Sequence, residues 1–387
     1  MSTLVLADLI WHPLVPAGAG NRQRILSLAA CGPGVRAHLI GPGPFPDATG
    51  LPVVTVKPWR PIWRPPWFNP DLLGFLPPRA IRRMARAAAA LHPDIVLSEG
   101  LWAVPAGSQT ARLTGRPLAV TVNNIEHVVL LQRRKLAWAT AVRFIERSWY
   151  ARADLLIAMS TEDARRLKCV LGRSCPRVEV VPNGVEPPSE LGVQADVPHP
   201  NVMFLGKTDY PPNAEAIREL QHSWLPAARS LGIPVTAVVV GGPRAPAWQG
   251  DLVFSGYVDA VWPWINAADV CVAPLISGSG TRLKVLTYLA AGRPVIATEV
   301  AVEGLGMAPE IHYLRAETGE EFAAALARVR GTPELAAELG RRGKELAQRF
   351  SWNAIGKHWA GVLQSAAGGA PTDSSLVGAE ARVTHPR

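Results

Sequence analysis

The sequence predicts an α/β protein with two successive domains, each built on a parallel β-sheet. Three observations support this. The chain has 387 residues, and chains beyond ~250–300 residues usually divide into domains. Short apolar runs alternate with helical stretches, which is typical of parallel sheets buried on both faces. The alternation is interrupted by a polar, proline-rich stretch at residues 186–200 and then starts again.

The first half opens with a predicted strand at residues 3–7, a loop that contains glycines, and a helix at about 21–30. The further expected strands are 37–40, 53–56, 95–98, 118–122, 155–159 and 178–181, with helices at 79–91 and 139–150. Pro182-Asn183-Gly184 then gives a turn signal. We therefore assign residues 1–183 to an N-terminal domain and 184–200 to a linker.

The second half repeats the pattern. The expected strands are 201–205, 236–240, 252–254, 270–274 and 294–297, with helices at 213–223, 282–291, 319–330 and 333–350. An amphipathic helix near 354–366 ends the ordered part. The predicted layout is a second domain over 201–352, a C-terminal helix over 353–366, and a disordered tail over 367–387 that is rich in small and polar residues.

Composition and charge narrow the class of protein. Residues 1–13 lack a basic region and include Asp8, so they do not resemble a signal peptide. No apolar run reaches the ~18–20 residues that span a bilayer. The cysteines form no CxxC pair, which favours reduced thiols and a cytoplasmic location. The net charge of +9 favours anionic partners.

Much of the positive charge lies in residues 57–86, which hold seven basic residues and one acid, Asp71, together with Trp59, Trp63 and Trp67. Cations interleaved with tryptophan suit an anionic membrane surface, so we expect peripheral contact with the inner face of the cell membrane. A proline-rich surface loop with its tryptophans packed on the domain fits equally well. No nucleic-acid partner is expected, because no nucleic-acid-binding module accompanies the charge.

The strongest chemical signal is the segment 274–287. A predicted strand ends there, Gly278 and Gly280 form a turn, and a helix begins near Thr281. Backbone amides and the helix dipole make such a turn an anion site. Arg282 and Lys284 add two positive charges where helix stability alone favours acids, so we expect a diphosphate. Without a ligand, both side chains are expected to face solvent. An ordinary strand–turn–helix with solvated cations is the alternative.

This segment also carries a family resemblance. The run SGSGTRLKVLTYLAAGRPVIATEVAVEGL resembles the donor-binding segment of retaining glycosyltransferases of family four, which have the GT-B fold. Other motifs agree in the same order over residues 3–366. These are the loop with Gly18, Gly20 and Arg22, then 181–185 (VPNGV), 204–206 (FLG), 209–213 (DYPPN), 256–258 (GYV) and Ser351-Trp352. The resemblance implies two Rossmann-like domains with sheets facing across a cleft, and a last helix that crosses back onto the first domain.

The function that the resemblance implies is transfer of a hexosyl unit from a nucleoside diphosphate sugar to a saccharide or lipid-linked acceptor, in cell-surface glycan synthesis. The implied mechanism retains the anomeric configuration and needs no cofactor. No DxD carboxylate pair occurs in the chain, which fits a metal-independent reaction. Two alternatives stay open: a catalytically inactive GT-B scaffold or binding partner, and a GT-B enzyme of another reaction, such as a nucleotide-sugar epimerase.

The resemblance also assigns residues, position by position. The catalytic candidates are Arg282, Lys284 and Asn123, and the acceptor candidates are Asn124, Glu126 and His127. The donor candidates are Gly18, Gly20, Gly206, Lys207, Tyr257, Val258, Gly278, Ser279, Gly280, Thr281 and Thr287. Tyr257 and Val258 lie in the segment that resembles the family's loop for the nucleotide base, and an edge strand that fills its own core is the alternative there. No metal site is expected.

Three positions depart from the family pattern. Ser279 and Thr287 stand where the family has two glutamates that contact the donor. Asn123 stands where the family often has a histidine. Loss of one charged hydrogen bond costs ~1.5–3 kcal/mol, so the replacements predict weaker donor affinity unless another group substitutes. For the loop with Asn123, a purely structural turn is the alternative to substrate positioning.

Overall fold

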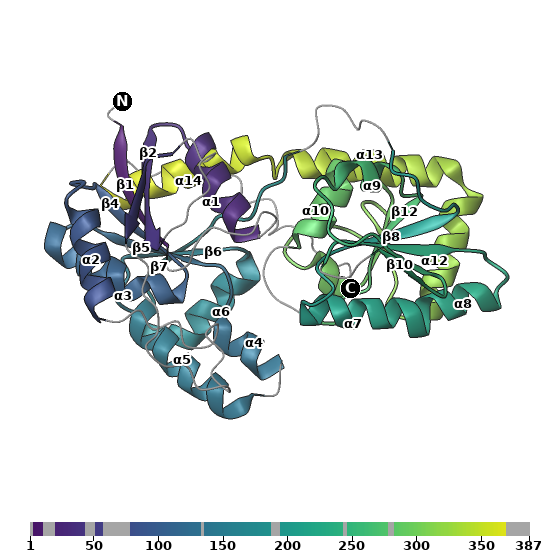
Figure 1. Ribbon diagram of the computed structural model, residues 1–387, viewed down its shortest axis with the longest axis horizontal. Helices are drawn as coiled ribbons and strands as arrows, with labels where there is room; N and C mark the ends of the chain where they lie inside the picture. The colour runs from purple at the N-terminus through teal and green to yellow at the C-terminus, as the bar shows by residue number, and fades with distance from the viewer. Residues whose placement is uncertain are drawn as a thin grey trace, which may run out of the picture. The chain divides into compact units, whose positions relative to one another are not determined.

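A computed structural model describes residues 3–10, 20–42, 51–56, 78–132, 135–186, 194–242, 246–277 and 282–368 (Figure 1). The chain forms two compact units. Unit 1 is Met1–Asn183 together with Trp352–Arg387, and unit 2 is Gly184–Ser351.

Unit 1 is built on a parallel sheet of seven strands in the order β3-β2-β1-β4-β5-β6-β7. The strands are β1 Leu4–Ile10, β2 Val35–Pro42, β3 Val53–Val56, β4 Ile95–Glu99, β5 Leu118–Val122, β6 Leu155–Ala158 and β7 Arg177–Val180. The strand order reverses beside β1, which pairs with both β2 and β4. Open α/β sheets bind ligands at such a switch point, outside the carboxyl ends of the strands.

Helices cover both faces of this sheet. They are α1 Gly20–Cys31, α2 Pro78–Ala89, α3 Val104–Thr114, α4 Glu126–Gln132, α5 Leu136–Tyr150, α6 Thr161–Leu171 and α14 Trp352–Ala366, with 3₁₀ turns at Leu101–Ala103 and Gly172–Ser174. Alternate strand residues face opposite layers. In β1, Leu6 packs in the cluster that includes α1 and α14, whereas Leu9 packs in the cluster that includes α2, α3 and α5. Both faces are therefore apolar, as the short hydrophobic runs predict.

The last helix completes unit 1. Trp352, Ile355 and Trp359 of α14 are each at most 3% exposed and pack with residues of β1, β4 and β5. A Cβ atom at Gly356 would lie 2.7 Å from backbone atoms of Cys31, so glycine allows α14 to approach α1 closely. Residues from the end of the sequence thus belong to the core of the first unit.

Unit 2 has a seven-stranded sheet in the order β10-β11-β9-β8-β12-β13-β14. The strands are β8 Asn201–Leu205, β9 Thr236–Val240, β10 Ala247–Gln249, β11 Leu252–Phe254, β12 Val270–Ala273, β13 Val295–Ala297 and β14 Leu314–Arg315. All pairs are parallel except the edge pair β10 and β11. The switch point of this sheet lies between β8 and β12.

The helices of unit 2 are α7 Pro211–Glu219, α8 Leu225–Ser230, α9 Trp262–Asn266, α10 Leu283–Ala290, α11 Glu299–Val302, α12 Gly319–Gly331 and α13 Pro333–Gln348, with a π-helical turn at Leu220–Trp224. Trp224 is fully buried and stacks on Phe322 of α12, with ring centres 4.6 Å apart. The carbonyl oxygen of Gly292 touches Gly340, which has no side chain to hold the two segments apart.

The predicted α/β class and parallel sheets are confirmed, and two described strands of unit 2 were not predicted: β10, which pairs antiparallel, and β14. In the part of the chain that the structure describes, no helix is long and apolar enough to cross a membrane. Residues 57–77, 187–193 and 278–281 and most of the predicted tail, 369–387, lie outside the described residues.

Candidate functional site

The switch point of unit 2 brings two helix starts together. β8 and β12 are parallel neighbours, with Val202 opposite Val270, so the connections that follow them leave the same edge of the sheet. α7 follows β8, and α10 follows β12. The first turns of these helices therefore meet at the edge where such sheets bind their ligands.

Lys284, in the first turn of α10, joins these elements. Its Nζ donates to Oδ1 of Asn213 at 2.6 Å and lies 4.1 Å from the centre of the Phe204 ring. Burial, and secondly the charge of Arg282, lower the pKa of the Lys284 amine to about 7. The amine is therefore close to half-protonated at neutral pH, and a nearby anion would favour its charged form.

Arg282 immediately precedes α10 and is only 8% exposed. Its Nε donates to the carbonyl oxygen of Val300 in α11, at 3.2 Å. The sequence-based expectation that Arg282 and Lys284 face solvent is wrong, because both side chains contact neighbouring elements. Two cations thus lie at the positive end of the helix dipole, with no acid in the first turn of α10.

Glycines allow the neighbouring loops to pack closely at the same edge. A Cβ atom at Gly206 would lie 2.6 Å from Nδ2 of Asn213, and one at Gly242, which has φ +101°, would lie 2.5 Å from Oγ1 of Thr208. The amide of Gly206 donates to the carbonyl oxygen of Val240 at 2.9 Å. The connections after β8 and β9 therefore leave no room for side chains at these glycines.

The predicted base-binding loop follows β11, so it lies at this edge as well. Tyr257 is 56% exposed, whereas Val258 packs against the core of unit 2. The amide of Gly241 donates to the carbonyl oxygen of Gly256 at 3.1 Å, which joins this loop to the one after β9. A role for either residue in holding a base stays a prediction.

Of the remaining donor candidates, the structure describes Thr287, Lys207 and Gly20. The hydroxyl of Thr287 donates to the carbonyl oxygen of Leu283 at 2.7 Å, which leaves it free only to accept. Lys207 is partly buried, and its carbonyl oxygen accepts a 2.9 Å hydrogen bond from Nδ2 of Asn213. Gly20 is the first residue of α1. Gly18, Gly278, Ser279, Gly280 and Thr281 lie outside the described residues.

Two polar residues at this edge were missed in the sequence analysis. Asn213 is 7% exposed and bridges the loop after β8 to Lys284. Glu215 accepts a 2.6 Å hydrogen bond from the hydroxyl of Ser277. The signal was a polar residue at the start of a helix that follows a buried strand, the position where α/β proteins place ligand-binding groups.

The switch point of unit 1 holds a second group of buried charges. Asp8 of β1, Arg24 of α1 and Glu99 of β4 are each at most 5% exposed. Arg24 donates through Nη1 to the carbonyl oxygen of Pro182 at 2.8 Å and to Oδ1 of Asn183 at 3.2 Å. The signal in the sequence is the presence of two acids, Asp8 and Glu99, in otherwise apolar strands.

Burial dominates the electrostatics of this group. It raises the pKa of the Asp8 carboxyl well above its usual range, and the charge of Glu99 adds to the effect. Burial also raises the pKa of Glu99, against the opposing charge of Arg24 and hydrogen bonds from Thr121 and Asn123. The pKa of Arg24 falls to about 10 because of burial, which the charge of Glu99 partly offsets.

Asn123 thus joins the charged group of unit 1 through Glu99, whereas its neighbour Asn124 is exposed. Glu126 begins α4, and its backbone amide donates to Glu146 of α5 at 2.6 Å. His127 is 5% exposed, with Nδ1 2.5 Å from the same carboxylate. The acceptor candidate His127 therefore lies in α4, where its buried ring anchors this helix to α5.

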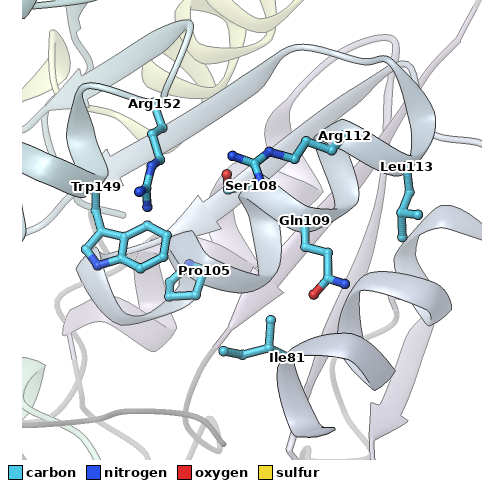
Figure 2. A pocket seen from close by; sticks show the side chains of 8 residues that line it. All are labelled: Ile81, Pro105, Ser108, Gln109, Arg112, Leu113, Trp149 and Arg152. Atoms are coloured by element: carbon cyan, nitrogen blue, oxygen red, sulfur yellow. The ribbon is translucent and has the colours of Figure 1, made fainter. Parts of the chain in front are cut away.

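A separate groove of about 550 Å³ lies on the helical surface of unit 1, between α2, α3 and α5 (Figure 2). The Arg152 guanidinium lies over the Trp149 ring, 4.2 Å from its centre, and Arg112 also lines the groove. No acidic residue lines it. Its lining combines two cations with apolar side chains and the polar Ser108 and Gln109, which suits an anion that carries an apolar part.

The structure therefore gathers the described donor candidates other than Gly20 near the carboxyl edge of the unit 2 sheet, whereas Gly20 and Asn123 belong to unit 1. Within the described residues, no three His, Cys, Asp or Glu side chains come together as metal ligands.

Comparison with known proteins gives a match for each half of the chain. Residues 17–188 match the family model described as Glycosyltransferase Family 4, and residues 199–330 match the model described as Glycosyl transferases group 1. A phosphatidyl-myo-inositol mannosyltransferase of Propionibacterium freudenreichii is 27% identical over 232 residues. That match covers 56% of this chain and 58% of the relative's length.

Solved structures resemble nearly the whole chain. Sucrose-phosphate synthase of Thermosynechococcus elongatus has a TM-score of 0.73 at 19% identity, over 94% of this chain and 98% of that one. Anabaena HepE, solved with UDP and glucose, has a TM-score of 0.66 at 15% identity, over 94% and 100%. A glycosyltransferase of Rickettsia africae has a TM-score of 0.68 at 12% identity, over 95% and 99%. These likenesses confirm the fold expected from the sequence.

Proposed function

The chain belongs to the family-four type of glycosyltransferases, with the GT-B fold, and from that premise we propose that it transfers a sugar from a nucleoside diphosphate sugar. The observation that carries the proposal is the placement of Lys284 and Arg282 at the start of α10, beside the switch point of unit 2. A departing diphosphate gains negative charge, and fixed cations and helix amides stabilise that charge as it develops.

The proposal extends to the reaction course. We assign a retaining transfer of a hexosyl unit in which Lys284 and Arg282 supply the positive charge at the leaving group, without a metal ion. Asn123, held by Glu99 in unit 1, would position a substrate hydroxyl by hydrogen bonding. An amide does not titrate near neutral pH, so Asn123 is not proposed as an acid or a base. Turnover is expected to be unchanged by EDTA, and loss of turnover that Mg²⁺ restores would contradict this part.

A screen of UDP- and GDP-sugars for release of nucleoside diphosphate tests the main proposal. Lys284→Met is expected to lower the rate at least tenfold, the cost of one lost charged interaction of ~1.5–3 kcal/mol. Lys357→Met, an exposed position on α14, is the matched control and keeps the wild-type rate. Arg282→Ala is a poorer probe, because Arg282 is buried against Val300.

The main alternative is a GT-B scaffold that binds donor without turnover, or binds none. It is favoured by Ser279 and Thr287 in place of the family's glutamates. Wild-type protein that binds a nucleotide sugar calorimetrically but releases no nucleoside diphosphate, with or without acceptors, would establish it. Conversion of the donor into an epimer would instead establish the epimerase alternative.

We also propose a saccharide or lipid-linked acceptor and contact of unit 1 with an anionic membrane surface, as in cell-surface glycan synthesis at the inner face of the membrane. The described part of the basic segment supports it, since α2 exposes four arginines, Arg79, Arg82, Arg83 and Arg86. The groove with Arg112 and Arg152 (Figure 2) adds cations beside Trp149. The relative named above is a phosphatidyl-myo-inositol mannosyltransferase.

Flotation with liposomes tests the membrane contact. Vesicles with anionic lipid are expected to retain the wild-type protein at moderate salt, and Arg112→Ala with Arg152→Ala is expected to weaken retention several-fold. Arg341→Ala with Arg342→Ala, at exposed positions of unit 2, serves as the control for loss of two charges. Equal retention on neutral vesicles, or none on either kind, would contradict the proposal.

A further inference from the structure

Asn213 is the central polar contact between the two helix starts at the switch point of unit 2. Its amide nitrogen donates to the carbonyl oxygen of Lys207 at 2.9 Å, and its amide oxygen accepts from Lys284 Nζ at 2.6 Å. Because the side chain is 7% exposed and bonded at both ends, its orientation is fixed. Lys284 is therefore held in one position before any ligand binds.

We propose that Asn213 is a positioning residue that holds the Lys284 amine where the donor's diphosphate binds, and that donor binding consequently takes up a proton at this amine. The inference rests on the proposed donor site and goes beyond it, since it assigns a role to Asn213 and a proton stoichiometry to binding.

The surroundings of Lys284 explain why it takes up a proton. The aromatic face of Phe204 and the neutral amide of Asn213 are its close neighbours. Within the described residues it forms no ion pair, since Glu215 of α7 instead accepts from Ser277. Arg282 adds positive charge from the residue before α10, and Tyr288, one turn further along, accepts from the amide of Leu205.

A bound diphosphate shifts the protonation equilibrium of the Lys284 amine toward the charged form. Burial and Arg282 lower the pKa of the amine to about 7, so much of it is neutral in weakly alkaline solution. Two phosphate charges beside Nζ favour the ammonium form. The amine then takes one proton from the buffer, while no covalent bond of the donor forms or breaks. By linkage, donor binding at pH 7.5 is expected to take up a measurable fraction of a proton.

Calorimetry measures this stoichiometry directly. Donor is titrated at pH 7.5 into protein in HEPES and in Tris, whose ionisation enthalpies differ and which do not supply a competing phosphate, so the difference in heat gives the protons taken up. The probes are UDP-glucose and GDP-mannose, because the diphosphate of a nucleotide sugar has no group that titrates near pH 7. Proton uptake by the wild type and none by Lys284→Met is the expected result.

Two variants test Asn213 itself. Asn213→Ala is expected to release the lysine to solvent and to reduce uptake to below about 0.2 of a proton. Asn213→Asp keeps the size and the acceptor atom, but its carboxylate keeps the lysine charged, so uptake is again lost and affinity falls about tenfold. Gln221→Ala, an exposed amide just after α7, is the matched control with wild-type uptake.

The outcomes separate this inference from the proposed function. If the wild type binds neither nucleotide sugar, both fail. If it binds one without proton uptake, or if folded Asn213→Ala and Asn213→Asp both keep wild-type uptake, the proposed donor site survives and only this inference fails. Thermal unfolding of each variant, measured beforehand, confirms that the protein titrated is folded.

Discussion

Single residues at the two switch points carry charge into positions that water does not fully solvate. Lys284 in unit 2 and Asp8 in unit 1 both have a pKa displaced by burial, downward for the amine and upward for the carboxyl. In each case the folded state disfavours the charged form. Such residues reduce stability, which is the pattern expected where binding rather than stability has been selected.

Replacing Lys284 by methionine is expected to stabilise unit 2 in the absence of donor. The folded pKa is lowered, so the folded state binds fewer protons than the unfolded state between about pH 7 and 10.5, and wild-type stability rises with pH over that window. The advantage of the variant should be about 1–3 kcal/mol larger at pH 6.5 than at pH 9. Urea unfolding at both pH values measures it, and an advantage that grows with pH would contradict the argument.

Replacing Asp8 by asparagine should give the opposite pH dependence. The folded pKa of this carboxyl is raised, so the folded state binds more protons, and wild-type stability falls as the pH rises above the ordinary value for aspartate. Asp8→Asn is expected to gain about 1–3 kcal/mol at pH 8. The gain should shrink as the pH falls toward the ordinary aspartate pKa of 3.8, which provides an internal control. The same gain at low pH would show that the effect is one of packing.

The sequence predicts the identity of these site residues better than their surroundings. Lys284 and Arg282 were placed correctly at a helix start, but their burial was not foreseen, because it depends on α7 and α11, which come from distant parts of the chain. The burial of His127 was not foreseen for the same reason, since its partner Glu146 lies on another helix. Periodicity and motifs describe one segment at a time and contain no information on such contacts.

At the scale of elements, the predicted strands agree with the observed ones closely, because buried parallel strands are continuous apolar runs bounded by turn residues. The helix α3 was not predicted. It contains Pro105 and Gly107 among small polar residues, which have weak helical propensity, and Gly107 instead serves packing against Ser98 of β4. α6 was also missed, although Ser160 caps it through the amide of Asp163.

The contact between α10 and α13 gives a prediction at this scale. Gly340 of α13 touches the carbonyl oxygen of Gly292, which follows α10, and neither backbone can yield to a methyl group. Gly340→Ala is expected to destabilise unit 2 by about 2–4 kcal/mol. Gly331→Ala, at the end of α12 with no atom near the added methyl group, is the matched control and should be neutral or slightly stabilising. Equal unfolding midpoints for the two variants would refute the packing argument.

At the scale of the whole molecule, the two units differ in how the chain builds them. Unit 2 is one continuous stretch of the chain, whereas unit 1 includes α14, which follows unit 2 in the sequence. A fragment of residues 184–351 is therefore expected to unfold cooperatively by itself. A fragment of residues 1–183 should expose the apolar face that Trp352, Ile355 and Trp359 cover, and bind a hydrophobic dye.

Joining residues 352–368 to residue 183 through a flexible linker tests the reason for this difference. The joined fragment is expected to regain a cooperative transition, measured by circular dichroism, because α14 again covers the sheet. The same linker followed by a scrambled 352–368 sequence is the control. A cooperative transition in the bare 1–183 fragment would show that α14 is dispensable.

The position of α14 in the chain has a consequence during synthesis. After the first 183 residues, the ribosome must translate all of Gly184–Ser351 before the missing helix exists, a delay of about 10–30 s at typical elongation rates. During that interval the apolar sheet face that α14 later covers is exposed to solvent, and we expect chaperones at the ribosomal exit tunnel to bind it.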